Sequence, residues 1–269
     1  MKTLITILLV CTIYSGHAQF KINKKAVSSA TKVTKALTFS NEDAIKVSAE
    51  AVVWMDENNP VATDQDPYSI RLNRLFKNHQ NEDGLKLNYK VYLVKDINAF
   101  ACADGSVRVF SSLMDILTDE ELLAVIGHEI GHVKNEDTKK AIKTAYISAA
   151  AMDAASSQSG AVQTLSESQL GEFAQQFLGS SHSRKQESKA DDYSYAFMKK
   201  NNYDVVGAYT AFKKLGLLSA SSKKQKTIEK MMNSHPDSNQ RAEKVMEKSK
   251  KDGLWKDPGT VSLPTHPIK

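Results

Sequence analysis

The chain has 269 residues, of which 41% are hydrophobic and 25% are charged. This is the composition of a globular protein, and the length is enough for one domain with a sizeable core. Lys and Arg number 36 against 31 Asp and Glu, for a net charge of +5. The basic residues are scattered among acidic ones, which predicts a solvated surface rather than a nucleic-acid-binding footprint, so we expect no nucleic acid partner.

The first twenty residues, MKTLITILLVCTIYSGHAQF, have the pattern of a cleavable secretory signal. Lys2 precedes an apolar run from Leu4 to Ile13, and small residues follow at Gly16 and Ala18. We place the cleavage after Ala18, so residues 1–18 are expected to be a signal peptide of a periplasmic or secreted bacterial protein. The apolar run is too short for an integral membrane span and no charged stop follows it.

The two cysteines bear on anchoring and on stability. Cys11 raises the alternative of a lipid-modified signal, but Val10 stands where such a signal usually has a small residue, so lipoprotein anchoring is less favoured. Once the signal is removed, Cys102 is alone and no intramolecular disulfide can form. Stability must then come from packing or from a metal ion, and Cys102 is expected to be a small strand residue rather than a reactive thiol.

A mainly helical domain is predicted over residues 41–250, between a basic lead-in at 19–40 and a tail at 251–269. Periodicity and capping residues predict helices over residues 42–57, 68–79, 113–117, 119–135, 138–155, 167–178, 183–200, 205–217 and 238–250. Among them, LNYKVYLVKD alternates like a strand, and NAFACADGSVRVFSS carries Asp104-Gly105, a favoured hairpin turn. We therefore expect an α+β, mainly helical fold with a small antiparallel sheet.

The segment from Ala145 to Gln169 is rich in Ala and Ser. Asp153 in its middle makes it too polar for a membrane span. Its small side chains fit either closely packed helices or a flap, and the sequence leaves both open.

The stretch ELLAVIGHEIGHVKNED, residues 121–137, places two histidines four residues apart in a predicted helix. Positions four apart differ by about 40° around a helix and lie one turn apart. His128 and His132 can therefore bind the same zinc ion, while Glu129 between them can reach water at the metal. This is the geometry of a catalytic zinc site.

Two glycines in the same helix favour this interpretation over two buried core histidines. Gly127 and Gly131 stand in the helix interior, where each glycine costs about 1 kcal/mol relative to alanine. Such a cost indicates the close approach of another backbone or of a ligand.

A catalytic zinc needs a third protein ligand, and two candidates follow. In SRKQESKADDYSYAFM, Glu187 and Asp191 are four residues apart and so lie on one face of a helix. Glu187 can be the metal ligand and Asp191 the acceptor for the free N–H of a ligating histidine. The alternative is that both belong to a solvated acidic face. His235 precedes a helix that contains Arg241, and is either a ligand or a donor to a developing oxyanion. The other histidines lack partners at ligand spacing and are expected at the surface: His79, His182 and His266.

Four segments together resemble a known family: NAFACADGSVRVFSSLMDIL, DEELLAVIGHEIGHV, SRKQESKADDYSYAFM and SHPDSNQRAEKV. In order and separation they are similar to the zinc metalloendopeptidases that include the HtpX-like and prenyl-protein (CAAX) proteases, metallopeptidase family forty-eight. The resemblance extends from about Glu42 to Lys248 and is closest to soluble, secreted bacterial members. It implies a gluzincin fold with one zinc ion per chain, held by His128, His132 and Glu187.

The resemblance also implies roles for the residues around the metal. Glu129 would be the general base and Asp191 a support behind the ligands, while His235 and Arg241 match the family's His-Pro and following Arg. The residues Asn98, Ala99, Phe100 and Ala101 resemble the family's edge strand, which holds a peptide substrate by adding it to the sheet. Membrane members have hydrophobic spans where this chain is Ala/Ser-rich, which speaks against prenylated or membrane-buried substrates.

The sequence thus predicts a zinc-dependent endopeptidase whose substrates are polypeptides, in particular envelope or secreted proteins, with protein quality control as one role. The alternative is a zinc-stabilised chaperone-like or assembly factor with latent or no proteolysis, working with envelope protein partners. A third possibility is a purely structural metal site with four protein ligands, for which His235 is the candidate fourth ligand; a closed site of that kind could equally be a latent enzyme whose histidine must move aside.

Overall fold

The computed structural model describes residues 39–150, 164–221 and 225–267. The expected signal peptide, nearly all of the lead-in and residues 151–163 lie outside the described residues. The helices of the described part are α2 (Asn41–Glu57), α3 (Pro67–Phe76), α4 (Ser111–Met114), α5 (Asp119–Lys134), α6 (Asp137–Ala150), α7 (Glu167–Leu178), α8 (Arg184–Lys200), α9 (Val206–Ala220), α10 (Gln225–Ser234) and α11 (Ser238–Lys251). All of them except α10 were predicted, with ends that differ by a few residues; the predicted end of α6 at residue 155 lies outside the described residues.

The start of α5 is fixed by its own first residues. The Thr118 side chain accepts a hydrogen bond from the backbone N–H of Glu121, and the Glu121 carboxylate accepts one from the N–H of Thr118. This reciprocal cap satisfies donors that a helix terminus otherwise leaves unpaired. The helix therefore runs without interruption through both histidines of the motif.

A three-stranded sheet, in the order β3-β5-β4, lies beside α5. β4 (Ala99–Ala101) and β5 (Ser106–Phe110) form the predicted antiparallel hairpin, and its turn needs Gly105, whose φ is +89° and whose added Cβ would lie 1.9 Å from the Lys86 carbonyl oxygen. β3 (Asn88–Tyr92) pairs in parallel with β5, so the sheet is mixed rather than purely antiparallel as predicted. The reason is that the connection after β3 crosses to the far edge of β5 before the chain turns back.

β4 is the edge strand of this sheet on the side that approaches α5. A second, two-stranded antiparallel sheet is formed by β1 (Asn81–Glu82) and β2 (Leu85–Lys86).

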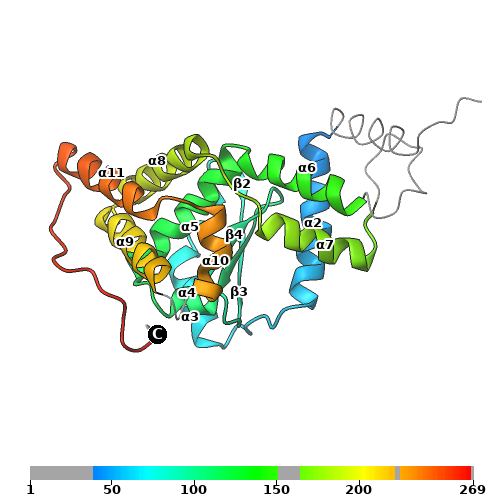
Figure 1. Ribbon diagram of the computed structural model, residues 1–269, viewed down its shortest axis with the longest axis horizontal. Coiled ribbons are helices and arrows are strands. Elements are labelled where there is room, and N and C mark those ends of the chain that lie inside the picture. The colour runs from blue at the N-terminus through cyan, green and yellow to red at the C-terminus, as the bar shows by residue number, and fades with distance from the viewer. Residues whose placement is uncertain (1–38, 151–163, 222–224, 268–269) are drawn as a thin grey trace, which may run out of the picture.

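Two hydrophobic cores lie on the two sides of the sheet, with α8, α9 and α11 on one side and α2, α6 and α7 on the other (Figure 1). The first core joins the sheet to α5, α8, α9 and α11 and includes Val91, Val107, Val109, Ile126, Ile130 and Phe212. The second core joins strand residues on the other face of the sheet to α2, α6 and α7. It includes Val47, Tyr92, Phe100, Phe110, Tyr146 and Phe173. The buried apolar residues of the motif helix α5 therefore belong to the first core, and the sheet separates them from the second.

The glycines of α5 allow α8 to pack directly against it. A Cβ added at Gly131 would lie 3.1 Å from the Cα of Ala190 and 3.0 Å from the Cβ of Tyr193. One added at Gly127 would lie 3.0 Å from the ring of Phe197. The close approach expected from the sequence is thus an approach to α8, which carries the remaining predicted ligand.

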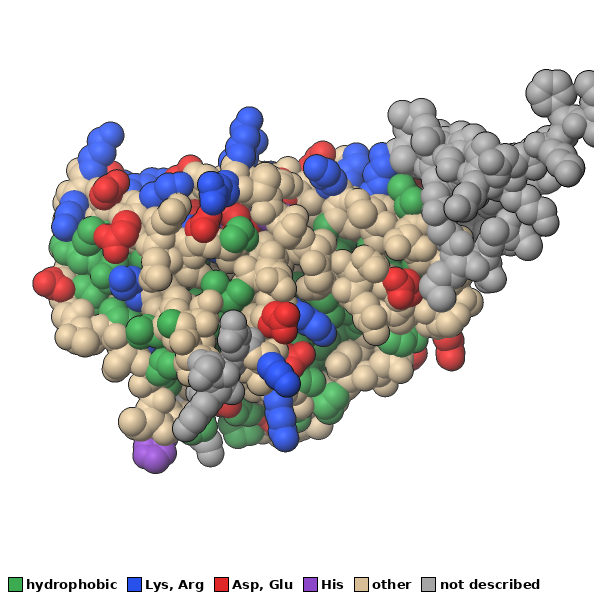
Figure 2. All heavy atoms as spheres, viewed as in Figure 1, with side chains coloured by type: hydrophobic (Ala, Val, Ile, Leu, Met, Phe, Trp, Pro, Cys, Tyr) green, Lys and Arg blue, Asp and Glu red, His purple; other side chains and the backbone are tan. Residues whose placement is uncertain are grey.

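The surface mixes charges of both signs. Figure 2 shows Lys and Arg side chains along the upper edge of the molecule, with Asp and Glu side chains between them. Several of these charges pair, as Lys248 does with Asp192 and Lys199 with Asp252. Within the described part of the chain, no helix combines the length and the apolar character needed to cross a bilayer.

Candidate metal centre

Four buried side chains meet between α5, α8 and the end of α10. The cluster consists of His128, His132, Glu187 and His235, whose donor atoms all lie within 4.8 Å of one another. His132 Nε2 is 3.0 Å from His128 Nε2 and 3.2 Å from Glu187 Oε1. His235 Nδ1 is 3.2 Å from His128 Nε2 and 3.1 Å from Glu187 Oε1. The structure thus brings both third-ligand candidates to the same point.

The donor set suits zinc. Nitrogen and carboxylate oxygen are common zinc ligands, and two ligands at about 2.1 Å from a tetrahedral zinc lie about 3.4 Å apart. The separations of 3.0–3.2 Å among these atoms are close to that value. Three imidazoles and a carboxylate converging in a buried place have no other evident common partner, so the residues fit a bound metal ion.

Each of the two helical histidines is oriented by a carboxylate at its other ring nitrogen. His128 Nδ1 lies 2.9 Å from Asp191 Oδ1, which is the place predicted for Asp191. His132 Nδ1 lies 3.1 Å from Asp137 Oδ2. Such carboxylate–histidine contacts fix the ring orientation and the tautomer of a metal ligand. Sequence reasoning missed Asp137, although a carboxylate five residues after His132 was a usable signal.

Arg241 ties the carboxylates together. Its Nη1 lies 2.8 Å from Glu187 Oε2, and its Nη2 and Nε lie 2.6 and 2.9 Å from the two Asp191 oxygens. Its guanidinium also stacks over Phe212 at 4.0 Å from the ring centroid. Nη2 also lies 3.0 Å from His128 Nδ1. These donors all face side chains of the metal-ligand region, which favours a positioning role for Arg241 over donation to an oxyanion.

This arrangement holds the carboxylates ionised. Burial alone would raise the pKa of Asp191, but the Arg241 guanidinium and His128 outweigh it and lower that pKa to about 2. Burial opposes ionisation of Glu187 as well, yet the neighbouring histidines, first among them His128, hold its pKa well below the usual range. Both groups are therefore anionic at neutral pH, as a metal ligand and its support need to be.

Glu129 lies beside the cluster with an unengaged oxygen. It is 4% exposed, and its Oε1 has no hydrogen-bond partner in the described structure. The nearest basic atom is His235 Nε2, 3.6 Å away. A buried carboxylate oxygen without a hydrogen bond costs stability, and Glu129 keeps such a free acceptor beside the cluster.

The edge strand predicted to bind substrate lies along the same place. The four residues predicted to bind substrate are Asn98, Ala99, Phe100 and Ala101. They line a cavity of about 30 Å³ together with Glu129 and His235. The opposite wall is the end of α7 and the segment after it, with Phe177 packed edge-on against Phe100 at 5.9 Å. The space is narrow here, so a peptide along β4 requires the α7 side to move outward.

Two histidines expected at the surface have other positions. His182 is half-buried and stacks on the ring of His132, with centroids 3.8 Å apart, and its backbone N–H donates to the Ser234 carbonyl. Burial and the neighbouring His132 and His235 lower the pKa of His182 to about 3. His79 is 3% exposed and lies between Glu82 and Tyr203, at 2.6 and 2.7 Å. Spacing along the chain could not reveal the contacts of His182 with His132 or of His79 with Tyr203, whereas Glu82 is only three residues from His79. His266 is exposed as expected.

Cys102, directly after β4, is buried as expected, and burial raises the pKa of its thiol well above the ordinary value. It is therefore a packing residue in the second core.

Comparison with known proteins gives a consistent result. Peptidase family M48 matches residues 71–249 of the chain. The chain is 38% identical over 224 residues to metalloprotease YcaL of Escherichia coli, covering 83% of this chain and 86% of that protein. It is 35% identical over 255 residues to metalloprotease LoiP of the same organism, covering 94% and 99%. A shorter match, 32% over 116 residues, joins it to the mitochondrial metalloendopeptidase OMA1 of Bos taurus, with 39% of this chain and 22% of that protein covered.

Proposed function

The chain belongs to peptidase family M48 and is a metalloendopeptidase, and from that premise we propose that one zinc ion, held by His128, His132 and Glu187, is its metal. The observation that carries this proposal is the buried convergence of these donors beside the unengaged oxygen of Glu129. Substrates are polypeptides, and we place them among envelope or secreted proteins.

The roles of the residues follow from their positions. A bound zinc supplies Lewis acidity, which acidifies water and polarises a scissile carbonyl. Glu129 takes the proton from the attacking water and returns it to the leaving nitrogen, which its free oxygen permits. Asp191 and Asp137 hold the two ligating imidazoles in place, and β4 offers backbone groups that a peptide strand can pair with.

His235 is the nearest group for donating to the oxygen on which charge develops. Its Nε2 faces Glu129 and its Nδ1 faces the ligand cluster. Removing one such donor lowers kcat by about 10²- to 10³-fold in enzymes of this general kind.

The position of His235 also supports a second form of the site. Because His235 Nδ1 lies as near to His128 and Glu187 as those ligands lie to one another, it can serve as a fourth ligand and keep the enzyme latent. Substituting His235→Ala separates the two roles. A latent enzyme gains peptidase activity in the variant at unchanged zinc content, whereas loss of an oxyanion donor lowers activity.

The compartment is proposed from the N-terminal pattern alone. Cleavage after Ala18 would place the mature chain in the periplasm or outside the cell, where unfolded envelope proteins are available as substrates and a quality-control role follows. Sequencing the N-terminus of the protein recovered from expressing cells tests this. A mature chain that begins at Gln19 supports it, and one that retains Met1 rejects it.

The direct test of the mechanism is Glu129→Gln. We expect the purified protein to cleave an unfolded polypeptide, a chelator to abolish cleavage, and the variant to lose about 10³- to 10⁴-fold in kcat/KM while keeping its zinc. Glu247→Gln is the matched control, since Glu247 is exposed on α11. Retained cleavage by Glu129→Gln rejects the proposed base.

A further inference from the structure

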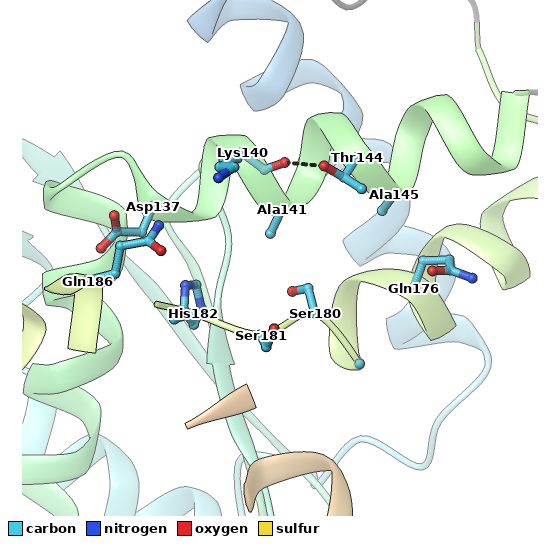
Figure 3. A pocket seen from close by; sticks show the side chains of 11 residues that line it. Asp137, Lys140, Ala141, Thr144, Ala145, Gln176, Ser180, Ser181, His182 and Gln186 are labelled. Carbon is cyan, nitrogen blue, oxygen red and sulfur yellow. Dashed lines mark hydrogen bonds between the residues drawn. The ribbon is translucent and has the colours of Figure 1, made fainter. Parts of the chain in front are cut away.

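A polar cavity of about 330 Å³ lies between α6 and the end of α7. We call it the α6–α7 pocket, and it is lined by Asp137, Lys140, Ala141, Thr144, Ala145, Gln176, Gly179, Ser180, Ser181, His182 and Gln186. Figure 3 shows the side chains of Ala141 and Ala145 directed from α6 toward Ser180, with His182, Asp137 and Gln186 at one end. The volume is within the range of pockets that bind small ligands, which begins at about 300 Å³.

The pocket adjoins the metal centre. His182 and Ser180 line both this pocket and the narrow cavity along β4, so they form the wall between the two. The ring of His182 also stacks on the ring of His132, one of the proposed metal ligands. Asp137, at the same end of the pocket, bonds to His132. A peptide held at the metal therefore has the α6–α7 pocket within reach of a side chain next to the scissile bond.

Small residues create the space. Ala141 and Ala145 stand one turn apart on the face of α6 that lines the pocket, and Gly179 ends α7 opposite them. The remaining lining groups are mostly hydroxyls and amides, which suits a polar guest rather than an apolar one.

The charge of the lining is set by two residues. Asp137 is buried, and its carboxylate is engaged by His132 at 3.1 Å. Lys140 is exposed at the rim, and it makes no ion pair with any residue that the structure describes. The Asp137 carboxylate is thus buried and paired at one end of the α6–α7 pocket, and the charge that remains unpaired at its open rim is that of Lys140.

We propose that the α6–α7 pocket is a specificity subsite that receives an acidic side chain of the substrate, Glu or Asp, with Lys140 as its charged partner. The inference rests on the proposed peptidase site and adds a substrate class to it. Lys140 selects among substrates and takes no part in the chemistry, so its replacement changes which bonds are cut rather than whether bonds are cut.

The test is a cleavage profile. Zinc-loaded protein is incubated with a peptide library, and the residues flanking each cut are read by mass spectrometry. We expect an enrichment of Glu and Asp by about fivefold at one position within three residues of the scissile bond, the size of an exposed ion pair. Lys140→Glu should remove this enrichment or turn it toward Lys and Arg. Lys143→Glu is the matched control on the same helix, outside the pocket lining, and should leave the profile unchanged.

A second pair of variants tests the space itself. Ala141→Leu fills the α6–α7 pocket and should flatten the preference at the same position. Ala150→Leu, also partly buried on α6 but outside the lining, should not. Thermal melting of all four variants identifies any that fail to fold.

The results separate the subsite from the peptidase site. Cleavage without acidic preference, or equal losses in Lys140→Glu and Lys143→Glu, overturns the subsite and leaves the proposed function intact. Absence of any cleavage by the zinc-loaded wild-type protein rejects the proposed function and the subsite with it.

Discussion

The two sides of the metal centre are packed differently. On the ligand side, α5 contacts α8 so closely that a Cβ added at Gly127 or Gly131 would lie 3.0 Å from a side chain of α8. A buried arginine joins two carboxylates behind the histidines. On the side of α6 and α7, alanines and a glycine enclose an open polar space of about 330 Å³. Dense packing holds the ligand side chains in a fixed geometry, whereas a space lined by a few side chains can change with those side chains. Substitutions that alter substrate choice are therefore expected on the α6–α7 side rather than on the ligand side.

The largest effect should come from breaking the carboxylate network. In Arg241→Ala, Glu187 and Asp191 lose their buried positive partner, and we expect the free energy of unfolding to fall by about 3–5 kcal/mol. Arg184→Ala removes a pair with Asp237 in which the arginine side chain is 83% exposed, and should cost about 0–1 kcal/mol. Urea denaturation of both variants measures the difference. Equal losses would show that the ligand side is not specially dependent on Arg241.

The next effect tests the packing of the two sides directly. Gly131→Ala forces α5 and α8 apart against backbone atoms of Ala190, and we expect a loss of about 1–3 kcal/mol together with weaker metal binding. Gly171→Ala on α7 meets only the Trp54 ring at 3.5 Å, an ordinary contact, so helix propensity should make it neutral or stabilising by up to about 1 kcal/mol. Thermal denaturation checks both, and a Gly131→Ala protein as stable as wild type would contradict the account of α5–α8 packing.

Asp137 belongs to both sides, because it orients His132 and lines the α6–α7 pocket. Asp137→Asn should weaken zinc affinity by about 10- to 100-fold, since the imidazole loses its carboxylate partner. Asp192→Asn, at an exposed position on α8, should leave affinity unchanged. Competition with a chelating dye measures both affinities, and identical values for the two variants would argue against the Asp137–His132 contact.

The smallest effect comes from a carboxylate remote from the metal. Burial raises the pKa of Asp56, but its contacts with Arg108, Lys90 and Tyr92 outweigh burial and lower that pKa below its ordinary value. Because the folded-state pKa is the lower one, the stabilisation is complete above the unfolded pKa of about 3.9 and is lost as pH falls through the folded pKa.

Metal-free wild type should therefore lose stability below about pH 4 more steeply than metal-free Asp56→Asn. Urea midpoints measured between pH 3 and pH 7 provide the comparison. Parallel curves would mean that the contacts around Asp56 do not stabilise the fold.

Local signals in the sequence identified the ligand side. The cap at Thr118, the four-residue spacing of His128 and His132, and the glycines that face α8 are all properties of one helix, so they can be read from consecutive residues. Glu187 and Asp191 could also be identified from the sequence, because they stand four residues apart on the single helix α8.

The α6–α7 side depends on contacts between distant segments. His182 stacks on His132 from 50 positions along the chain, and the pocket walls come from two helices whose alanines look ordinary in the sequence. The parallel pairing of β3 with β5 was missed because it depends on a crossover from β3 to β4, two strands that are not adjacent in the sheet. The helix α10 was missed although Ile228 and Met231, both buried, stand at helical spacing within it. His79 was misplaced because its partner Tyr203 is 124 residues away along the chain.

The central claim is that side chains from α5 and α8 hold one zinc ion in the cluster of His128, His132 and Glu187. Elemental analysis of the purified protein and of Glu187→Gln, after equal dialysis against a weak chelator, tests it most directly. We expect one zinc ion per chain in the wild type and a clear loss of zinc in the variant. Wild-type protein without stoichiometric metal, or a variant that retains zinc as tightly, would contradict it.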